Sequence, residues 1–184
     1  MAIICVFCSA EDNLPEICIK EARETGRLIG IRGHDFAYGG GNIGLMKEVA
    51  ISAKAHGAKI TGIVPERWKH LEKLEDKRLI AKDFRHRKIL YQMNSDAIIA
   101  LPGGFGTLDE IADTFVCIQH NVHQKPFALI NTNNFYQYLK QHIDKSYSEG
   151  YIDPKHRTKY TFVNTPLEAM DYIEEQLAKL KQQQ

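Results

Sequence analysis

Short runs of apolar and β-branched residues alternate along this chain with segments that repeat apolar residues at helical spacing. The apolar runs predict six strands, at residues 3–7, 35–38, 59–64, 97–101, 127–130 and 161–163. Strands that alternate with helices form parallel sheets covered on both faces, and such strands are apolar almost throughout. We therefore predict an α/β fold, a Rossmann-like three-layer α/β/α sandwich with a mainly parallel sheet. No linker or internal repeat divides the 184 residues, which predicts a single domain over residues 1–184.

The charge balance limits the partners of such a domain. The chain carries 24 basic and 23 acidic residues, a formal net charge of +1. Binding to nucleic acid or to an anionic membrane regardless of sequence needs a clustered excess of positive charge, so we expect neither partner. Any recognition of phosphate should therefore be local.

The N-terminal residues and the cysteines favour a cytoplasmic protein. Residues 1–8 lack a basic leader and a cleavage site, and no apolar run approaches the ~20 residues that span a bilayer. Cys5 and Cys8 form one C-x-x-C inside the first predicted strand, where an offset of three places them on opposite faces. No second pair completes a zinc site, so we expect four reduced thiols and no metal.

One segment interrupts the alternation. Residues 66–83 carry eleven charged residues and the only tryptophan, Trp68. Two interpretations are open: a solvated loop or surface helix, or a mobile flap over a binding site.

Two glycine-rich turns connect predicted strands to predicted helices. They contain Gly39, Gly40 and Gly41 in the first turn, and Gly103, Gly104 and Gly106 in the second. In doubly wound sheets, ligands bind beyond the carboxyl ends of the strands, where backbone amides and helix N-termini converge. Glycine allows the backbone to approach an anion closely. Two such turns at one edge favour a phosphate ligand over tight turns alone.

The first turn also fits a different function. Gly39, Gly41 and Gly44 satisfy G-x-G-x-x-G, and Glu66 follows about twenty residues later, as in nicotinamide-dependent dehydrogenases. That fingerprint usually opens the first β–α unit, whereas the turn after the first predicted strand, residues 9–13, has no glycine. A dehydrogenase is therefore the less favoured alternative.

The second turn leads into a carboxylate. Thr107 and Glu110 fit the capping box, in which the threonine caps a helix and the glutamate hydrogen-bonds back to it. The stripe predicted to face the sheet consists of Leu108, Ile111, Ala112 and Phe115. Glu110 lies roughly 150° from the centre of that stripe. We therefore expect it to project from the first helical turn beside a bound phosphate, and capping and catalysis are compatible there.

A cationic pair precedes this turn. Arg87 and Lys88 lie at the start of a predicted helix, where Arg87 shares with Leu90 the face turned toward the sheet and the crevice. A planar, permanently charged guanidinium suits the binding of a phosphate or a ribose.

Together these residues resemble the LOG family, the cytokinin riboside 5'-monophosphate phosphoribohydrolases, which are often labelled lysine decarboxylases. The resemblance rests on the Tyr-Gly-Gly-Gly turn with Gly-Leu-Met after it, on the Arg-Lys pair, and on Ser-Asp-Ala-x-Ile-x-Leu-Pro-Gly-Gly-x-Gly-Thr-x-x-Glu at residues 95–110. It extends from Val6 to Ile173, nearly the whole chain.

The resemblance implies hydrolysis of the N-glycosidic bond of a nucleoside 5'-monophosphate, AMP or a cytokinin riboside 5'-monophosphate, to free base and ribose 5-phosphate. It implies that Arg87 and Glu110 are catalytic. It assigns substrate binding to Lys88, Gly103, Gly104, Gly106, Thr107, Gly39, Gly40 and Gly41. It also implies a homodimer without a cofactor, and nothing in the sequence indicates the pyridoxal phosphate site of a decarboxylase.

The chain departs from the family pattern in places. Residues 84–88 shift the histidine of the usual Met-His-x-Arg-Lys by one position, and Cys8-Ser9-Ala10-Glu11 replaces a Cys-Gly-Ser-Ser turn. Segment 66–83 is also shorter than is usual. These departures leave the preferred base open, and they leave an alternative function open, a non-catalytic sensor or carrier of a nucleotide or cofactor.

Overall fold

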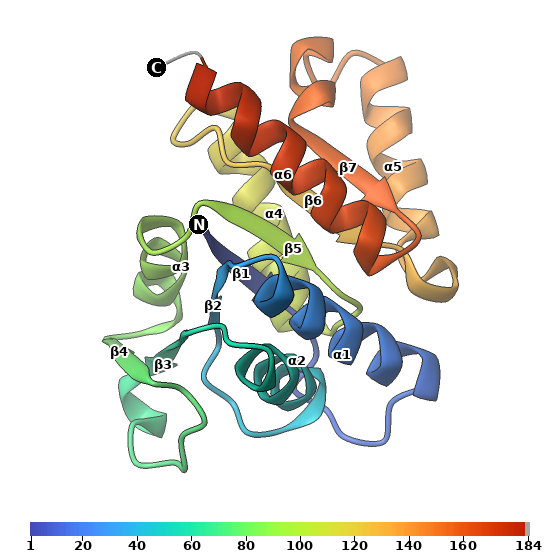
Figure 1. Cartoon of the computed structure of the whole chain (residues 1–184). Coiled ribbons are helices and arrows are strands. Elements are labelled where there is room, and N and C mark those ends of the chain that lie inside the picture. Colours follow the sequence, from blue (N-terminus) through green and yellow to red (C-terminus); the bar gives the residue numbers. More distant parts are fainter. Residues whose placement is uncertain (183–184) are drawn as a thin grey trace.

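A computed structural model, which describes residues 1–182, contains one sheet of seven parallel strands (Figure 1). The strands are β1 (Ile3–Phe7), β2 (Asp35–Tyr38), β3 (Ile60–Pro65), β4 (Lys77–Ala81), β5 (Ala97–Ala100), β6 (Phe127–Ile130) and β7 (Tyr160–Val163). Gln183 and Gln184, the end of the predicted domain, lie outside the described residues. The six predicted strands are confirmed to within one residue at each end, and so is the parallel sheet.

Helices cover both faces of the sheet. They are α1 (Glu16–Ile31), α2 (Gly44–Ala55), α3 (Phe84–Met93), α4 (Phe105–Gln119), α5 (Gln137–Ser148) and α6 (Pro166–Gln182), with short 3₁₀ turns η1 (Glu66–Trp68), η2 (Thr132–Asn134) and η3 (Pro154–Lys159). Helices α1, α2 and α6 pack on one face, and α3, α4 and α5 lie on the other (Figure 1). This confirms the three-layer α/β/α sandwich.

The strand order creates a crevice at one point of the sheet. The order is β4-β3-β2-β1-β5-β6-β7, so the chain adds strands on one side of β1 and then crosses to the other side with β5. The connections beyond β1 and β5 diverge to opposite faces at such a switch point, and ligands of doubly wound sheets bind there. The carboxyl ends of β1 and β5 therefore locate the candidate site.

Neither interpretation of segment 66–83 predicted its strand. Residues 77–81 form β4, which pairs with β3 and is the outer strand on that side of the sheet. An edge strand is exposed on one side, so it tolerates charged residues. Because of these residues, β4 lacks the continuous apolar run by which a buried strand is recognised in a sequence. Glu75 fixes the preceding loop, since it is 4% exposed, pairs with Arg78, and accepts a hydrogen bond from the Tyr38 hydroxyl (3.2 Å).

The cysteines lie as predicted. Cys5 packs in the core on the side of α3 and α4, whereas Cys8 packs in the core on the side of α1 and α2. All four cysteines are free, and three of them are buried. None of the helices formed by residues 1–182 combines the length and the apolarity needed to cross a bilayer.

Candidate functional site

The two glycine turns meet at the switch point. The Gly39–Gly41 turn follows β2, the Gly103–Gly106 turn follows β5, and β1 lies between these strands. Ser9, beyond the end of β1, joins both turns: its amide donates to the Pro102 carbonyl (3.1 Å), and its carbonyl accepts from the Leu45 amide (3.0 Å). The structure thus brings together two segments that the sequence only placed at equivalent edges.

The capping-box prediction is wrong. Helix α4 begins at Phe105, and Gly104 is its N-cap residue, with extended backbone (φ −87°, ψ −151°). Thr107 is therefore the third residue of the helix, is 4% exposed, and packs against Gly103 so closely that a Cβ on Gly103 would collide with its side chain. No side chain caps this helix end. The amides of its first turn have no intrahelical partners, which makes it suitable for binding an anion.

The placement of Glu110 also differs from the prediction. The buried residues of α4 are Thr107, Ile111, Thr114 and Ile118, whereas Leu108 is 46% exposed. Glu110 lies one turn after Thr107 and one turn before Thr114, on the flank of this buried stripe, and its side chain is 14% exposed. The buried face of α4 is rotated about the helix axis relative to the predicted apolar stripe, because Thr107 and Thr114 rather than Leu108 face the sheet. Glu110 therefore points toward the ends of the strands.

Burial makes Glu110 a weak acid. It raises the pKa of the Glu110 carboxyl to about 7, mainly because a buried carboxylate loses its hydration. The positive charge of Arg87 lowers this pKa, the negative charge of Asp109 raises it, and Lys88 and the nearby Tyr91 hydroxyl lower it by smaller amounts. A carboxyl of this kind can hold or release a proton near neutral pH.

Arg87 is held by the backbone of two neighbouring connections. Its Nε donates to the Ile63 carbonyl (2.8 Å), and its Nη2 donates to the Gly39 carbonyl (2.8 Å). Its Nη1 lies 4.0 Å from Oε1 of Glu110, and its side chain is 13% exposed. A Cβ on Gly39 would occupy the position of the guanidinium, so the absence of a side chain there admits Arg87. The prediction that Arg87 faces the crevice is confirmed.

Lys88 points elsewhere. Its Nζ lies 2.7 Å from Oδ1 of Asp109 and 3.6 Å from Oδ1 of Asp113, both on α4. Lys88 therefore joins α3 to α4. Its partner Asp109 is the residue directly before Glu110, and Lys88 forms no ion pair with Glu110 itself. Its role in substrate binding stays a prediction, as do those of the glycines and Thr107.

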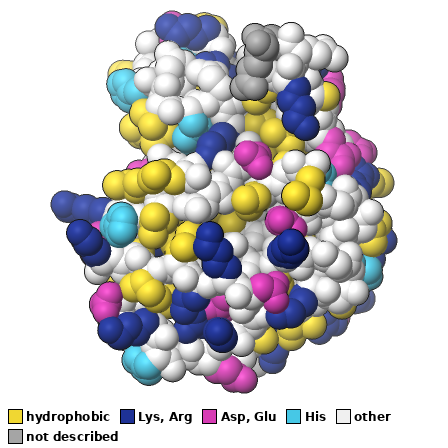
Figure 2. Space-filling view, turned by 60° about the vertical axis from the view of Figure 1, so that its left-hand side comes forward, with side chains coloured by type: hydrophobic (Ala, Val, Ile, Leu, Met, Phe, Trp, Pro, Cys, Tyr) yellow, Lys and Arg dark blue, Asp and Glu magenta, His cyan; other side chains and the backbone are white. Residues whose placement is uncertain are grey.

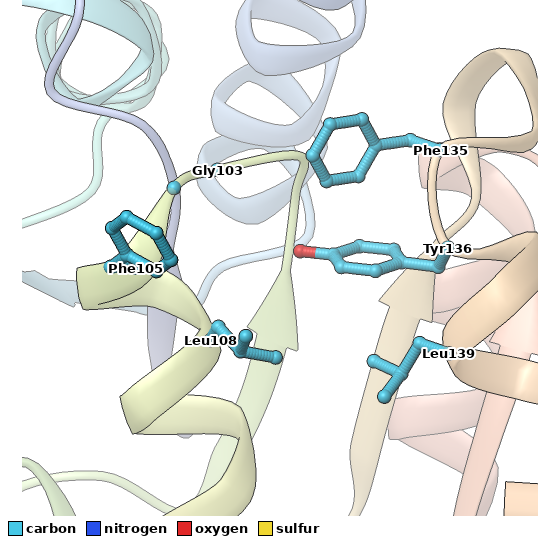
Figure 3. Close-up of a pocket in the computed structure, with 7 residues that line it drawn as sticks. Gly103, Phe105, Leu108, Phe135, Tyr136 and Leu139 are labelled. Carbon is cyan, nitrogen blue, oxygen red and sulfur yellow. The ribbon is translucent and has the colours of Figure 1, made fainter. Parts of the chain in front are cut away.

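The structure adds a pocket that the sequence did not indicate. A cavity of about 330 Å³ opens beside the second glycine turn and is lined by Gly103, Gly104, Phe105, Leu108, Phe135, Tyr136 and Leu139 (Figure 3). Leu108 of α4 and Leu139 of α5 face each other across it (Figure 3). The Tyr136 hydroxyl donates to the Leu101 carbonyl (2.6 Å), which fixes the ring beneath the turn. The adjacent aromatic residues after β6 were the available sequence signal.

The molecular surface shows charges of both signs. On the face in Figure 2, basic and acidic side chains are interspersed with hydrophobic ones. Among residues 1–182, no three or more histidine, cysteine, aspartate or glutamate side chains are grouped so that they could hold a metal ion.

Comparison with known proteins places this site in a family. The family described as "Possible lysine decarboxylase" matches residues 46–173, which include both catalytic candidates. LOG3 of Arabidopsis thaliana, a cytokinin riboside 5'-monophosphate phosphoribohydrolase, is 35% identical over 176 residues, which cover 94% of this chain and 81% of LOG3. The chain belongs to the LOG family. LOGL2 of Oryza sativa subsp. japonica, a probable enzyme of the same name, is 34% identical over 94% of this chain and 72% of its own length.

Solved structures resemble the LOG fold of this chain. The Moco carrier protein from Chlamydomonas reinhardtii superposes with a TM-score of 0.74 at 21% identity, over 96% of this chain and 98% of that one. The molybdenum cofactor binding protein from Rippkaea orientalis gives 0.73 at 24% identity, over 94% and 95%. At these identities the likeness shows the shared fold alone, and it confirms the Rossmann-like architecture.

Proposed function

We propose that this protein hydrolyses the N-glycosidic bond of a nucleoside 5'-monophosphate, AMP or a cytokinin riboside 5'-monophosphate, to free base and ribose 5-phosphate. The observation that carries the proposal is the pairing of Glu110 with Arg87 in a crevice bounded by two glycine turns. The activity in the names of LOG3 and LOGL2 supports it. The lysine decarboxylase description of the family does not account for these residues. Neither the two glycine turns nor the pair of Arg87 and Glu110 would catalyse a decarboxylation.

The amino end of α4 suits the 5'-phosphate. Its first turn offers free amides and the positive end of the helix dipole, and Gly104 and Gly106 leave open space where a side chain would stand. The Thr107 side chain lies directly behind Gly103. Binding energy from the phosphate would hold the ribose in place relative to Glu110.

Glu110 would act on the ribose as a carboxylate. As the bond from C1' of the ribose to the base nitrogen breaks, its electron pair leaves with the base and positive charge develops on the ribose. A carboxylate nearby stabilises this charge. Water then adds to C1' and gives one proton to Glu110. The departing base nitrogen takes up a proton from the solvent, and Glu110 later returns its proton to the solvent. Arg87 would fix the ribose hydroxyls or the phosphate, since its Nη1 faces the crevice beside Glu110.

The pocket supports a substrate with an apolar part. Its lining is mostly aromatic and aliphatic, and it shares Gly103 and Gly104 with the proposed phosphate turn. A ligand that joins a phosphate to a planar or aliphatic group fits this combination. The reaction needs water and no cofactor, and the free cysteines support a cytoplasmic location as part of the proposal.

The experiment is to incubate the protein with AMP and with isopentenyl-AMP and to measure released base by chromatography. Release from either substrate supports the proposal. Glu110→Gln should abolish release while nucleotide affinity changes little, whereas Glu175→Gln, an exposed carboxylate of α6, serves as the matched control. Tight binding of nucleotides without release from any monophosphate would instead support the carrier alternative, which the cofactor-binding proteins of the same fold motivate.

A further inference from the structure

Tyr91 is a buried tyrosine directly behind the candidate catalytic pair. It lies on α3 one turn after Arg87, and it is 2% exposed. Its ring contacts Phe7, the last residue of β1, edge to face, with ring centroids 5.3 Å apart and planes inclined at 63°. The ring is therefore fixed between the helix layer and the strand that forms the floor of the crevice.

The ring of Tyr91 supports Arg87. The Cζ atom of the guanidinium lies 5.2 Å from the centroid of this ring, a distance at which a cation is attracted to an aromatic face. The carbonyls of Ile63 and Gly39 hold other sides of the same guanidinium. Three contacts from different elements thus determine where Nη1 of Arg87 points.

The hydroxyl of Tyr91 lies near Glu110. Its proximity lowers the pKa of the Glu110 carboxyl against the larger effect of burial. Burial raises the pKa of the Tyr91 phenol well above its usual range, so the phenol keeps its proton and is able to donate to a carboxylate. A hydrogen bond from a neutral donor favours the charged carboxylate without adding a charge to the site.

We infer that Tyr91 is a positioning residue of this site, whose ring carries the Arg87 guanidinium and whose hydroxyl holds the Glu110 carboxylate. The contacts of Tyr91 are present whatever reaction the protein catalyses, but a role for Tyr91 in catalysis rests on the proposed function. Tyr91 would keep carboxylate and guanidinium in register and make the charged form of Glu110 available near neutral pH.

Other titratable groups also lie near Glu110. From α3 these are Arg87 and Lys88, from α4 it is Asp109, from β1 and the residue after it they are the thiols of Cys5 and Cys8, and ahead of α5 it is the Tyr136 hydroxyl. Burial raises the pKa of both thiols, so they stay protonated and carry no charge. The Tyr136 hydroxyl is committed to the Leu101 carbonyl. Tyr136 is therefore a matched control for the loss of a buried phenol in this region.

The test is a titration of the Glu110 carboxyl by ¹³C NMR in the unliganded protein, compared with Tyr91→Phe and Tyr136→Phe. Tyr91→Phe keeps the ring and removes the hydroxyl, so we expect it to raise the pKa of Glu110 by about one unit. Tyr136→Phe should leave that pKa within about 0.3 units, because its hydroxyl bonds to a carbonyl. An unchanged pKa in Tyr91→Phe, or an equal shift in both variants, would overturn the inference.

A second variant tests the ring. Tyr91→Leu removes the aromatic face, and we expect the Arg87 Nε signal in ¹⁵N relaxation to become mobile, whereas Tyr91→Phe leaves it rigid. Equal rigidity in both variants would contradict a supporting role for the ring. In base release, Tyr91→Phe should shift the pH profile upward by the same amount as the NMR titration. If the unmodified protein releases no base, the proposed function fails while the two NMR measurements still decide the role of Tyr91.

Discussion

Nη1 of Arg87 lies 4.0 Å from Oε1 of Glu110, although one residue belongs to α3 and the other to α4. At this distance the guanidinium makes no hydrogen bond to the carboxylate, and two of its donors bind the carbonyls of Ile63 and Gly39 instead. Burial outweighs the attraction, and the pKa of Glu110 is raised to about 7. The pair therefore supplies a fixed cation beside a carboxyl that can exchange a proton.

The first prediction concerns pH. If Glu110 acts as a carboxylate, kcat/KM for base release should rise about tenfold for each pH unit below pH 7 and level off above it. The raised pKa means that the active, charged form is lost as the pH falls through about 7. Initial rates measured from pH 5 to 9 would show this limb, and a rate that falls between pH 6 and 8 would mean that Glu110 works as an acid.

Arg87→Lys should lower kcat/KM by about 100-fold. A lysine keeps the charge but has no planar fork, so it cannot bond to the Ile63 and Gly39 carbonyls and also face Glu110. Arg85→Lys, an exposed arginine on the same helix, should stay within about twofold and controls for the exchange of side chain. Comparable losses in both variants would argue against a specific role for the Arg87 fork.

The fold was largely predictable because its strands are buried. β1, β5 and β6 are apolar almost throughout, and each was found from its composition. β4 escaped because a strand at the edge of a sheet needs no continuous apolar run, and its sequence Lys-Arg-Leu-Ile-Ala follows a charged loop. Only the partner strand β3 identifies it, and that pairing is a property of the tertiary structure.

The sequence was enough to name the candidate residues of the site, but it was not enough to predict how their side chains are oriented. Spacing alone suggested that Leu108 faces the sheet, whereas Thr107 and Thr114 do so and Leu108 lines the pocket. Polar residues can occupy a buried helix face when they have partners, and the Thr114 hydroxyl donates to the Glu110 carbonyl (2.8 Å). Tyr91 gave no signal because a tyrosine in a helix is ordinary until its neighbours are known.

Gly103→Ala should destabilise the protein by roughly 1–3 kcal/mol and weaken AMP binding. A Cβ at Gly103 would collide with the Thr107 side chain, so the glycine turn must shift away from the helix end. A Cβ at Gly104 meets no atom within 4 Å, and Gly104→Ala should retain nearly all of the stability. Urea unfolding of both variants measures the difference, and equal stabilities would show that the turn adapts without cost.

We expect the homodimer that the family resemblance implies to form through the outer faces of α3 and α4. Ile89, Met93 and Val116 are exposed by 51%, 75% and 55%, and contacts of Lys88 and Gln92 with acidic residues of α4 hold the two helices together. Val116→Asp should convert a dimer into a monomer, because it would bury a charge in the expected interface. Light scattering after gel filtration measures this, with Ile51→Asp on α2 as the control. A monomeric unmodified protein at micromolar concentration would contradict the proposal.

Glu110→Gln should stabilise the protein at alkaline pH. The pKa of Glu110 is about 7 in the folded protein against 4.5 as its ordinary value, so the folded state binds the proton more tightly. Its contribution to stability is complete below pH 4.5 and is lost as the pH rises through about 7, where a buried charge replaces a neutral acid. A glutamine stays neutral, so its advantage should grow from near zero at pH 4.5 to about 3 kcal/mol at pH 9. Urea unfolding at both pH values checks this against Glu175→Gln, and an advantage that does not change with pH would mean that Glu110 is ionised without penalty.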